Sequence, residues 1–167
     1  LGPDAAPGTP EFDMFLREAH REMTVKAGQK CTAMRRLIVP AALIGDVAEA
    51  LAARLTATVV GDPRAEGVRM GALASKSQQA DVADATARLM AETTAIRAGW
   101  DGIDLRGDAE AGAFFAPTLL LCERPLENDA VHDVEAFGPV STLMAYDGGS
   151  AGIDEALALA ARGRGSL

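Results

Sequence analysis

Cysteine and histidine are scarce in this sequence. The 167 residues include two cysteines, Cys31 and Cys122, and two histidines, His20 and His132. The cysteines lie far apart and have neither partner cysteines nor clustered histidines beside them, so we expect no metal site. So few cysteines also fit a reducing compartment better than a disulfide-stapled secreted domain. We therefore expect a cytoplasmic protein.

Basic residues are outnumbered, and long apolar runs are missing. Lysine and arginine total 16 against 24 acidic residues, for a formal net charge of −8, and the basic residues are scattered. This balance disfavours nucleic acid and anionic membrane surfaces as partners. No apolar run approaches the roughly 18 residues that cross a bilayer. Residues 1–10 are rich in proline, glycine and alanine and lack the pattern of a secretory signal. We expect neither nucleic acid nor membrane as a partner.

What the chain does contain is an alternation of helical and extended patterns. Apolar residues at helical spacing predict helices from residue 10 or 11 to Gly28 and over 41–57, 75–98 and 153–161. Dense apolar runs predict strands over 36–39, 118–122 and 140–146. This alternation predicts an α/β fold with a mostly parallel layered sheet and flanking helices.

Several side chains have predictable local surroundings. Glu22 and Lys26 are four residues apart on a predicted helix, which favours an exposed ion pair. Cys122 ends the apolar run 118–122 and is expected in the core. His132 falls in a polar stretch, 128–133, and is expected to be exposed in a loop.

The chain is organised around the stretch 26–36, where a predicted helix ends and a strand begins. Cys31 sits at this junction, a place where backbone on both sides can hold a thiol facing a cleft. The alternative is that Cys31 is a small buried apolar residue, as most free cysteines are. The residues alone leave both interpretations open.

Two motifs resemble those of the aldehyde dehydrogenase superfamily. The first is Gly28-Gln29-x-Cys31 followed by Arg35 and Arg36, and the second is Glu135-Ala136-Phe137-Gly138-Pro139-Val140. They occur in that family's order and at about its spacing. More narrowly, four segments resemble the dehydrogenase part of the bifunctional enzymes of phenylacetate degradation, which also carry an oxepin-CoA hydrolase: residues 21–24, 27–32, 61–63 and 112–115.

The resemblance implies a role for three residues. Cys31 would be the nucleophile, with its backbone N–H as one donor to an oxyanion. Glu135 would hydrogen-bond a ribose hydroxyl of NAD or NADP, and Phe137 would pack near that ribose. The expected substrate is a small-molecule aldehyde, including a CoA-linked semialdehyde. Thr24 and Lys26 stand where family members commonly have an aromatic residue and an asparagine, so the aldehyde tunnel is expected to differ.

The resemblance also implies that residues 1–167 are part of a catalytic domain. The family's general base, its dinucleotide-binding domain and the hydrolase domain would lie outside this sequence, and the full-length enzyme would be a homo-oligomer. The piece alone is then expected to be inactive. Three alternatives remain: a generic or CoA-acylating aldehyde dehydrogenase fragment, a cysteine hydrolase using His20 or His132, and a non-catalytic interaction module.

Overall fold

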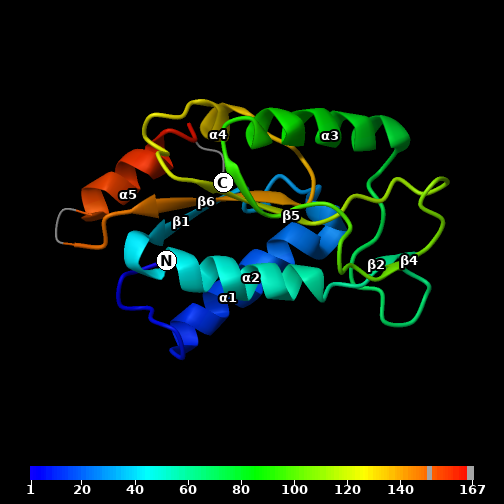
Figure 1. Ribbon diagram of the computed structural model, residues 1–167, viewed down its shortest axis with the longest axis horizontal. Helices are drawn as coiled ribbons and strands as arrows, with labels where there is room; N and C mark the ends of the chain where they lie inside the picture. Colours follow the sequence, from blue (N-terminus) through cyan, green and yellow to red (C-terminus); the bar gives the residue numbers. More distant parts are fainter. Residues whose placement is uncertain (150–151, 165–167) are drawn as a thin grey trace.

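A four-stranded sheet forms the centre of the computed structural model, which describes residues 1–149 and 152–164 (Figure 1). The strand order is β1-β6-β5-β3, with bounds Arg36–Pro40, Val140–Tyr146, Thr118–Cys122 and Thr94–Arg97. Strands β1, β6 and β5 run parallel, and the edge strand β3 is antiparallel to β5. The predicted α/β fold with a mostly parallel sheet is confirmed.

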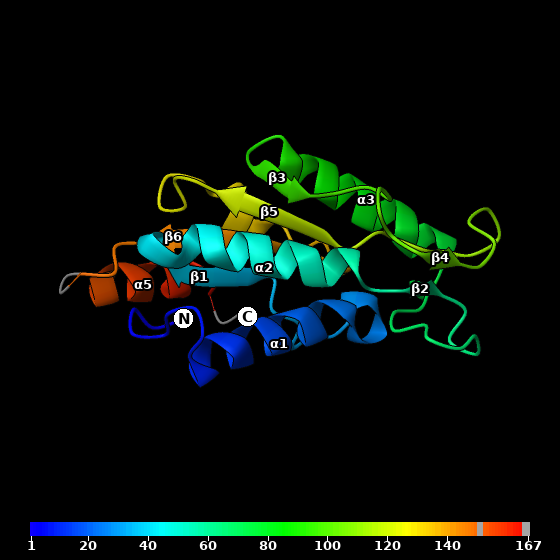
Figure 2. The same ribbon diagram turned by 60° about the horizontal axis from the view of Figure 1, so that its bottom comes forward.

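Helices cover both faces of this sheet. Helices α1 (Pro10–Thr24) and α2 (Ile44–Thr56) pack on one face, while α3 (Lys76–Met90) and the short α4 (Ala130–Asp133) pack on the other (Figures 1 and 2). Helix α5 (Gly152–Ala161) lies against β1 and β6. The remaining elements are the 3-10 turns η1 (Val25–Gly28) and η2 (Ala41–Leu43), and a small parallel sheet of β2 (Val60–Gly61) and β4 (Leu105–Arg106). None of the helices in the described ranges is long and apolar enough to span a membrane.

The core is divided in two by the sheet, because successive strand residues point to opposite faces. Leu119 and Leu143 belong to the cluster under α1 and α2, whereas Leu120 and Met144 belong to the cluster under α3 and α4. All four are fully buried. Burial on both faces explains why strands β5 and β6 read as continuous apolar runs.

Helix α1 begins as expected but ends one turn before Gly28. Thr9 caps its start, accepting a hydrogen bond from the amide of Phe12 at 3.3 Å. At its end the Thr24 hydroxyl donates to the carbonyl of His20 at 2.8 Å, and Val25 adopts an extended conformation. The predicted continuation to Gly28 is therefore wrong, since the chain turns at Val25.

Helix α3 is also shorter than predicted. It ends at Met90, and the Thr93 hydroxyl donates to the carbonyl of Leu89 at 2.8 Å just beyond that end. Residues 94–97, predicted as the last turn of this helix, instead form β3 and pair with β5. Pairing with a neighbouring strand outweighs the helical pattern of this segment.

His132 is buried, with 3% of its surface exposed, so the predicted exposed loop is wrong. Its Nε2 lies 2.7 Å from the carbonyl oxygen of Pro125, and Nδ1 lies 3.3 Å from Nη1 of Arg36. A carbonyl can only accept and a guanidinium can only donate, so the ring is neutral with its proton on Nε2. Burial lowers the pKa of His132, and the Arg162 and Arg36 charges act in the same direction.

We predict that the free energy of unfolding falls as the pH is lowered from about 6.5 towards 5. Burial lowers the pKa of both His132 and His20 in the folded chain. The unfolded chain therefore takes up protons first, and stability present above the unfolded pKa is lost as the pH falls towards the folded one. Urea unfolding at a series of pH values measures this slope.

His132→Gln is expected to flatten the slope, because the titrating ring is gone, and His20→Gln supplies the matched comparison for the second histidine. An unchanged slope in the double variant would show that neither ring is responsible.

Candidate active site

Cys31 lies in a tight turn between η1 and β1. The Lys30 amide donates to the carbonyl of Gly28 at 2.9 Å, and the Ala33 amide donates to the carbonyl of Lys30 at 3.2 Å. The second bond closes a four-residue turn over residues 30–33, in which Cys31 is the second residue. The Cys31 side chain is exposed, so a solute can reach the thiol.

The backbone just before this turn is unusual. Lys26, Ala27 and Gly28 have φ values of 54°, 51° and 70°, three successive residues in the left-handed region. For the two non-glycine residues this conformation costs of order 1 kcal/mol or more each. Ala27 and Gly28 are buried, so the packing around them holds this conformation.

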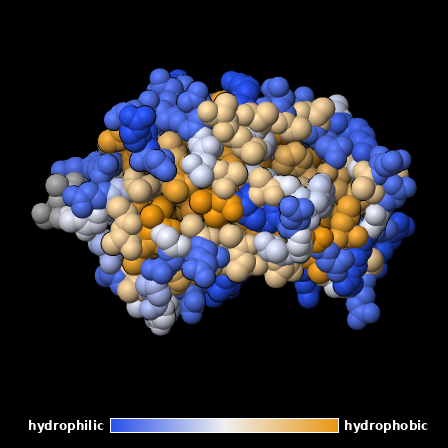
Figure 3. Space-filling view, in the orientation of Figure 1, coloured by the Kyte–Doolittle hydropathy of each residue, from blue (hydrophilic) through white to orange (hydrophobic). Residues whose placement is uncertain are grey.

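The second motif forms the loop that leads into β6. Glu135 and Phe137 are exposed, whereas Ala136 and Gly138 between and after them are buried. Phe137 has a φ of 40° and leaves 41% of its surface exposed. It is one of several large apolar side chains at the surface, and Figure 3 shows apolar and hydrophilic groups interspersed over one face. This loop therefore presents a carboxylate and an aromatic ring to the outside.

The two motif loops are in direct backbone contact. A Cβ added to Gly28 would lie 2.2 Å from the carbonyl oxygen of Gly138, which is too close for any side chain. On its other side, a Cβ added to Gly138 would lie 2.7 Å from a methyl group of Val82 in α3. The structure thus brings the Cys31 turn, the Glu135 loop and helix α3 together at one junction.

A narrow cleft runs between these loops. Its free volume is about 10 Å³, about enough for one water molecule. On one wall the Nζ of Lys30 lies 2.6 Å from Oε2 of Glu22, and both side chains are mostly buried. The ion pair predicted between Glu22 and Lys26 is thus replaced by one with Lys30. The lining residues are Glu22, Met23, Gly28, Lys30, Ala33, Met34, Arg35, Glu135, Ala136, Phe137, Gly138, Val140 and Ser141.

Arg35 ties the start of β1 to the chain just before Glu135. Its guanidinium donates to the carbonyls of Val134 and His132, each at 3.1 Å. These charge-assisted bonds fix the approach to the second motif loop. In the sequence Arg35 stands out only as part of a motif, because no local pattern shows which carbonyls its guanidinium reaches.

Both histidines have hydrogen-bond partners elsewhere in the fold. His20 contacts the Thr58 hydroxyl at 2.8 Å, and both ring nitrogens of His132 are engaged as described above. A cysteine hydrolase needs an imidazole beside its thiol, so the structure gives this alternative no support. In the described part of the chain, no group of three or more His, Cys, Asp or Glu residues is placed to hold a metal ion.

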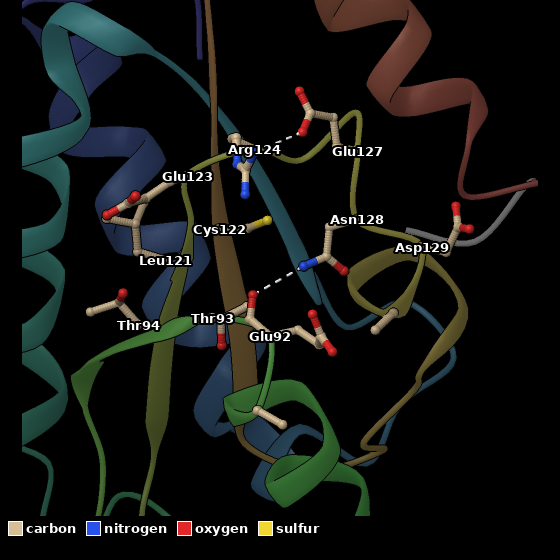
Figure 4. A pocket seen from close by; sticks show the side chains of 12 residues that line it. Glu92, Thr93, Thr94, Leu121, Cys122, Glu123, Arg124, Glu127, Asn128 and Asp129 are labelled. Carbon is tan, nitrogen blue, oxygen red and sulfur yellow. Dashed lines mark hydrogen bonds and ion pairs between the residues drawn. The ribbon is translucent and has the colours of Figure 1, made fainter.

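A roomier pocket, about 620 Å³, lies at the opposite edge of the sheet (Figure 4). Cys122 lines it at the carboxyl end of β5, whereas the two motifs precede the amino ends of the parallel strands β1 and β6. Only 2% of Cys122 is exposed, which confirms its predicted place in the core, and burial raises the pKa of its thiol. The two cysteines therefore lie at opposite ends of the parallel strands, and only Cys31 is accessible to solvent.

The site combines an exposed cysteine turn with a Glu-x-Phe-Gly-Pro loop that packs against it. Known proteins resemble this chain in sequence and in fold. The aldehyde dehydrogenase family model matches residues 9–163, and the chain belongs to this family. It is 48% identical over its whole length to 3,4-dehydroadipyl-CoA semialdehyde dehydrogenase of Aromatoleum evansii, covering 32% of that protein. It is also 46% identical over 98 residues to Protein MaoC of Klebsiella aerogenes, covering 59% of this chain and 27% of that protein.

Solved structures show the same relationship. A betaine aldehyde dehydrogenase variant from Staphylococcus aureus in complex with NAD⁺ superposes with a TM-score of 0.76 at 25% identity, over 95% of this chain and 30% of that one. A mutant of aldehyde dehydrogenase C from Pseudomonas syringae, in complex with NAD⁺ and octanal, gives 0.74 at 25% identity, over 94% and 30%. The chain spans about a third of the length of the curated relatives described above.

We predict that Gly28→Ala lowers the free energy of unfolding by more than about 1 kcal/mol. The added methyl group would collide with Gly138, and alanine disfavours a φ of 70°. Urea unfolding of the variant measures the loss.

Gly45→Ala is the matched control, because a Cβ at this helical glycine meets nothing within 4 Å. We expect it to be neutral or to stabilise by up to about 1 kcal/mol. Equal effects of the two substitutions would contradict the contact between the motif loops.

Proposed function

We propose that this chain carries the cysteine-bearing part of the active site of an NAD(P)-dependent aldehyde dehydrogenase, with Cys31 as its nucleophile. The observation that carries the proposal is the junction described above. An exposed thiol stands on a turn whose backbone packs directly on the loop that presents Glu135 and Phe137.

The chemistry requires a nucleophile because an aldehyde carbon does not release its hydrogen as hydride while the carbonyl is intact. The Cys31 thiolate adds to the carbonyl carbon, and the carbonyl oxygen becomes an oxyanion. The backbone N–H of Cys31 donates to that oxyanion. Oxidation of this adduct leaves a thioester on Cys31, and water then hydrolyses the thioester with the help of a general base.

The second motif loop fits a nicotinamide nucleotide. The exposed Glu135 carboxylate has acceptor oxygens for a ribose hydroxyl, and the exposed ring of Phe137 offers an apolar surface beside it. NAD or NADP, when bound, supplies the hydride acceptor. Both structural neighbours described above are complexes with NAD⁺, which supports this class of cofactor.

The name of one relative supports a substrate class. The relative from Aromatoleum evansii is named for a CoA-linked semialdehyde. We infer that this chain also serves the oxidation of a CoA-linked semialdehyde to the acid, in aerobic breakdown of an aromatic compound such as phenylacetate. Thr24 and Lys26, where family members commonly have an aromatic residue and an asparagine, fit a substrate different from that of generic members.

The rest of the site would come from outside residues 1–167. The cleft between the motif loops has room for about one water molecule, and Cys31 is not among the residues that line it, so an aldehyde and a nucleotide bound at this thiol need a second wall. We infer that a dinucleotide-binding domain of the same polypeptide supplies this wall and the general base, in a cytoplasmic homo-oligomer. The bifunctional arrangement with a hydrolase domain belongs to the same proposal.

We predict that Cys31→Ala in the full-length enzyme lowers aldehyde oxidation by at least about 10³-fold, because no other described thiol reaches the surface. The Kd for NAD or NADP should stay within about twofold. Steady-state kinetics and nucleotide titration measure the two effects. Cys122→Ala is the control and should change stability more than rate. Retained oxidation in Cys31→Ala would refute the nucleophile.

We also predict that the isolated 167-residue chain does not oxidise aldehydes, yet reacts with iodoacetamide at Cys31 and not at Cys122. Exposure makes the first thiol reactive and burial protects the second. Peptide mapping by mass spectrometry identifies the labelled residue. Aldehyde oxidation by the isolated chain would contradict the proposal that a second domain completes the site. A Cys31 that does not react with iodoacetamide would favour a non-catalytic interaction module.

A further inference from the structure

The side chain of Gln29, two residues before Cys31, reaches across to the start of α3. Its Oε1 accepts a hydrogen bond from the backbone amide of Ala74 at 2.8 Å. Its Nε2 donates to Oε1 of Gln78 at 3.2 Å. One carboxamide therefore links the cysteine turn to two points, one just before helix α3 and one in its first turn.

Hydrogen bonds at the N-terminus of α3 fix Gln78, and Ala74 directly precedes the capping residue Ser75. The Ser75 hydroxyl accepts a bond from the amide of Gln78 at 3.1 Å, and Gln78 donates from its Nε2 to Asp81 at 3.2 Å. The same helix contacts the Glu135 loop through Val82, which packs on Gly138. Helix α3 is therefore the common support of both motif loops.

The cysteine turn needs such a support. Three successive left-handed residues precede Gln29, and such a conformation persists only where the surroundings impose it. Gln29 is half-buried, and a half-buried amide without partners would be costly. Glutamine can accept from one group and donate to another at the same time, which an apolar residue cannot do.

We propose that Gln29 is a positioning residue. Its carboxamide clamps the cysteine turn to α3 and thereby sets where the Cys31 thiol stands relative to Glu135 and Phe137. The clamp itself follows from the hydrogen bonds, whereas its consequence for catalysis rests on the proposed dehydrogenase function. The hydrogen bonds of Gln29 go to protein groups of α3 and its cap, so it acts through the position of Cys31, and its loss should lower kcat more than it raises KM.

The first test is hydrogen exchange of the Ala74 amide in the 167-residue chain. Gln29→Met preserves the length of the side chain and removes both bonds, so the Ala74 amide should exchange about five- to tenfold faster. Gln79→Met is the matched control. Gln79 lies on the same helix and donates to the carbonyl of Phe114 at 2.5 Å, away from the cysteine turn. It should leave exchange at Ala74 unchanged.

The second test measures the thiol itself. The rate of iodoacetamide alkylation of Cys31, followed against pH, should change in Gln29→Met and stay as in the parent chain in Gln79→Met. Gln29→Glu keeps an acceptor for the Ala74 amide, so exchange at Ala74 should return towards the parent value. It should not restore the parent alkylation profile, because a carboxylate loses the bond to Gln78 Oε1 and adds a negative charge near the thiol.

The third test uses the full-length enzyme. Gln29→Met should lower kcat about tenfold or more, with KM for aldehyde and cofactor within about twofold. Three results in Gln29→Met would overturn the positioning role. The first is faster exchange at Ala74 with unchanged Cys31 alkylation and unchanged kcat. The others are a change in KM alone and unchanged exchange at Ala74. If the full-length parent oxidises no aldehyde, the dehydrogenase proposal fails, and exchange and alkylation still decide the role of Gln29.

Discussion

The close approach of Gly28 to Gly138 is the constraint on which the rest of the site depends. A side chain at either position would meet the carbonyl of Gly138 or the methyl groups of Val82. Because both are glycine, two segments far apart in the sequence share a backbone contact. That contact places the turn carrying Cys31 beside the loop carrying Glu135. Residues 26–28 and Phe137 have left-handed backbone conformations, which cost conformational energy, and they flank this contact.

The sheet explains where this junction lies. The Cys31 turn leads into β1 and the Glu135 loop leads into β6, and these strands are parallel neighbours. Their amino ends therefore share an edge, and the loops entering them meet there. In open α/β sheets, ligands commonly bind beyond the carboxyl ends of the strands, where this structure has the pocket lined by Cys122. The proposed chemistry is at the opposite edge, so it relies on the loops and on α3 as their support.

Electrostatics at this edge is arranged mainly for structure. The Lys30 ammonium is paired with Glu22, and Arg35 is bound to two backbone carbonyls. Glu135 and Cys31 stay exposed beside these engaged charges. The fold thus engages the Lys30 and Arg35 charges within the protein and leaves a thiol, a carboxylate and an aromatic ring exposed. Such an open surface suits a site completed by a second domain, as we propose.

The sequence by itself determined the α/β class, strands β1, β5 and β6, the core position of Cys122, and the two motifs that mark the family. Apolar periodicity and short motifs are local properties, so they survive without coordinates. Only the tertiary structure decided where α1 and α3 end, that His132 is buried, that Glu22 pairs with Lys30, and that Gln29 reaches α3. Each of these depends on a partner that the local pattern does not reveal. These partners are a neighbouring strand, a carbonyl distant in the sequence or a helix cap. They come within reach only when the chain folds, so the local sequence pattern does not identify them.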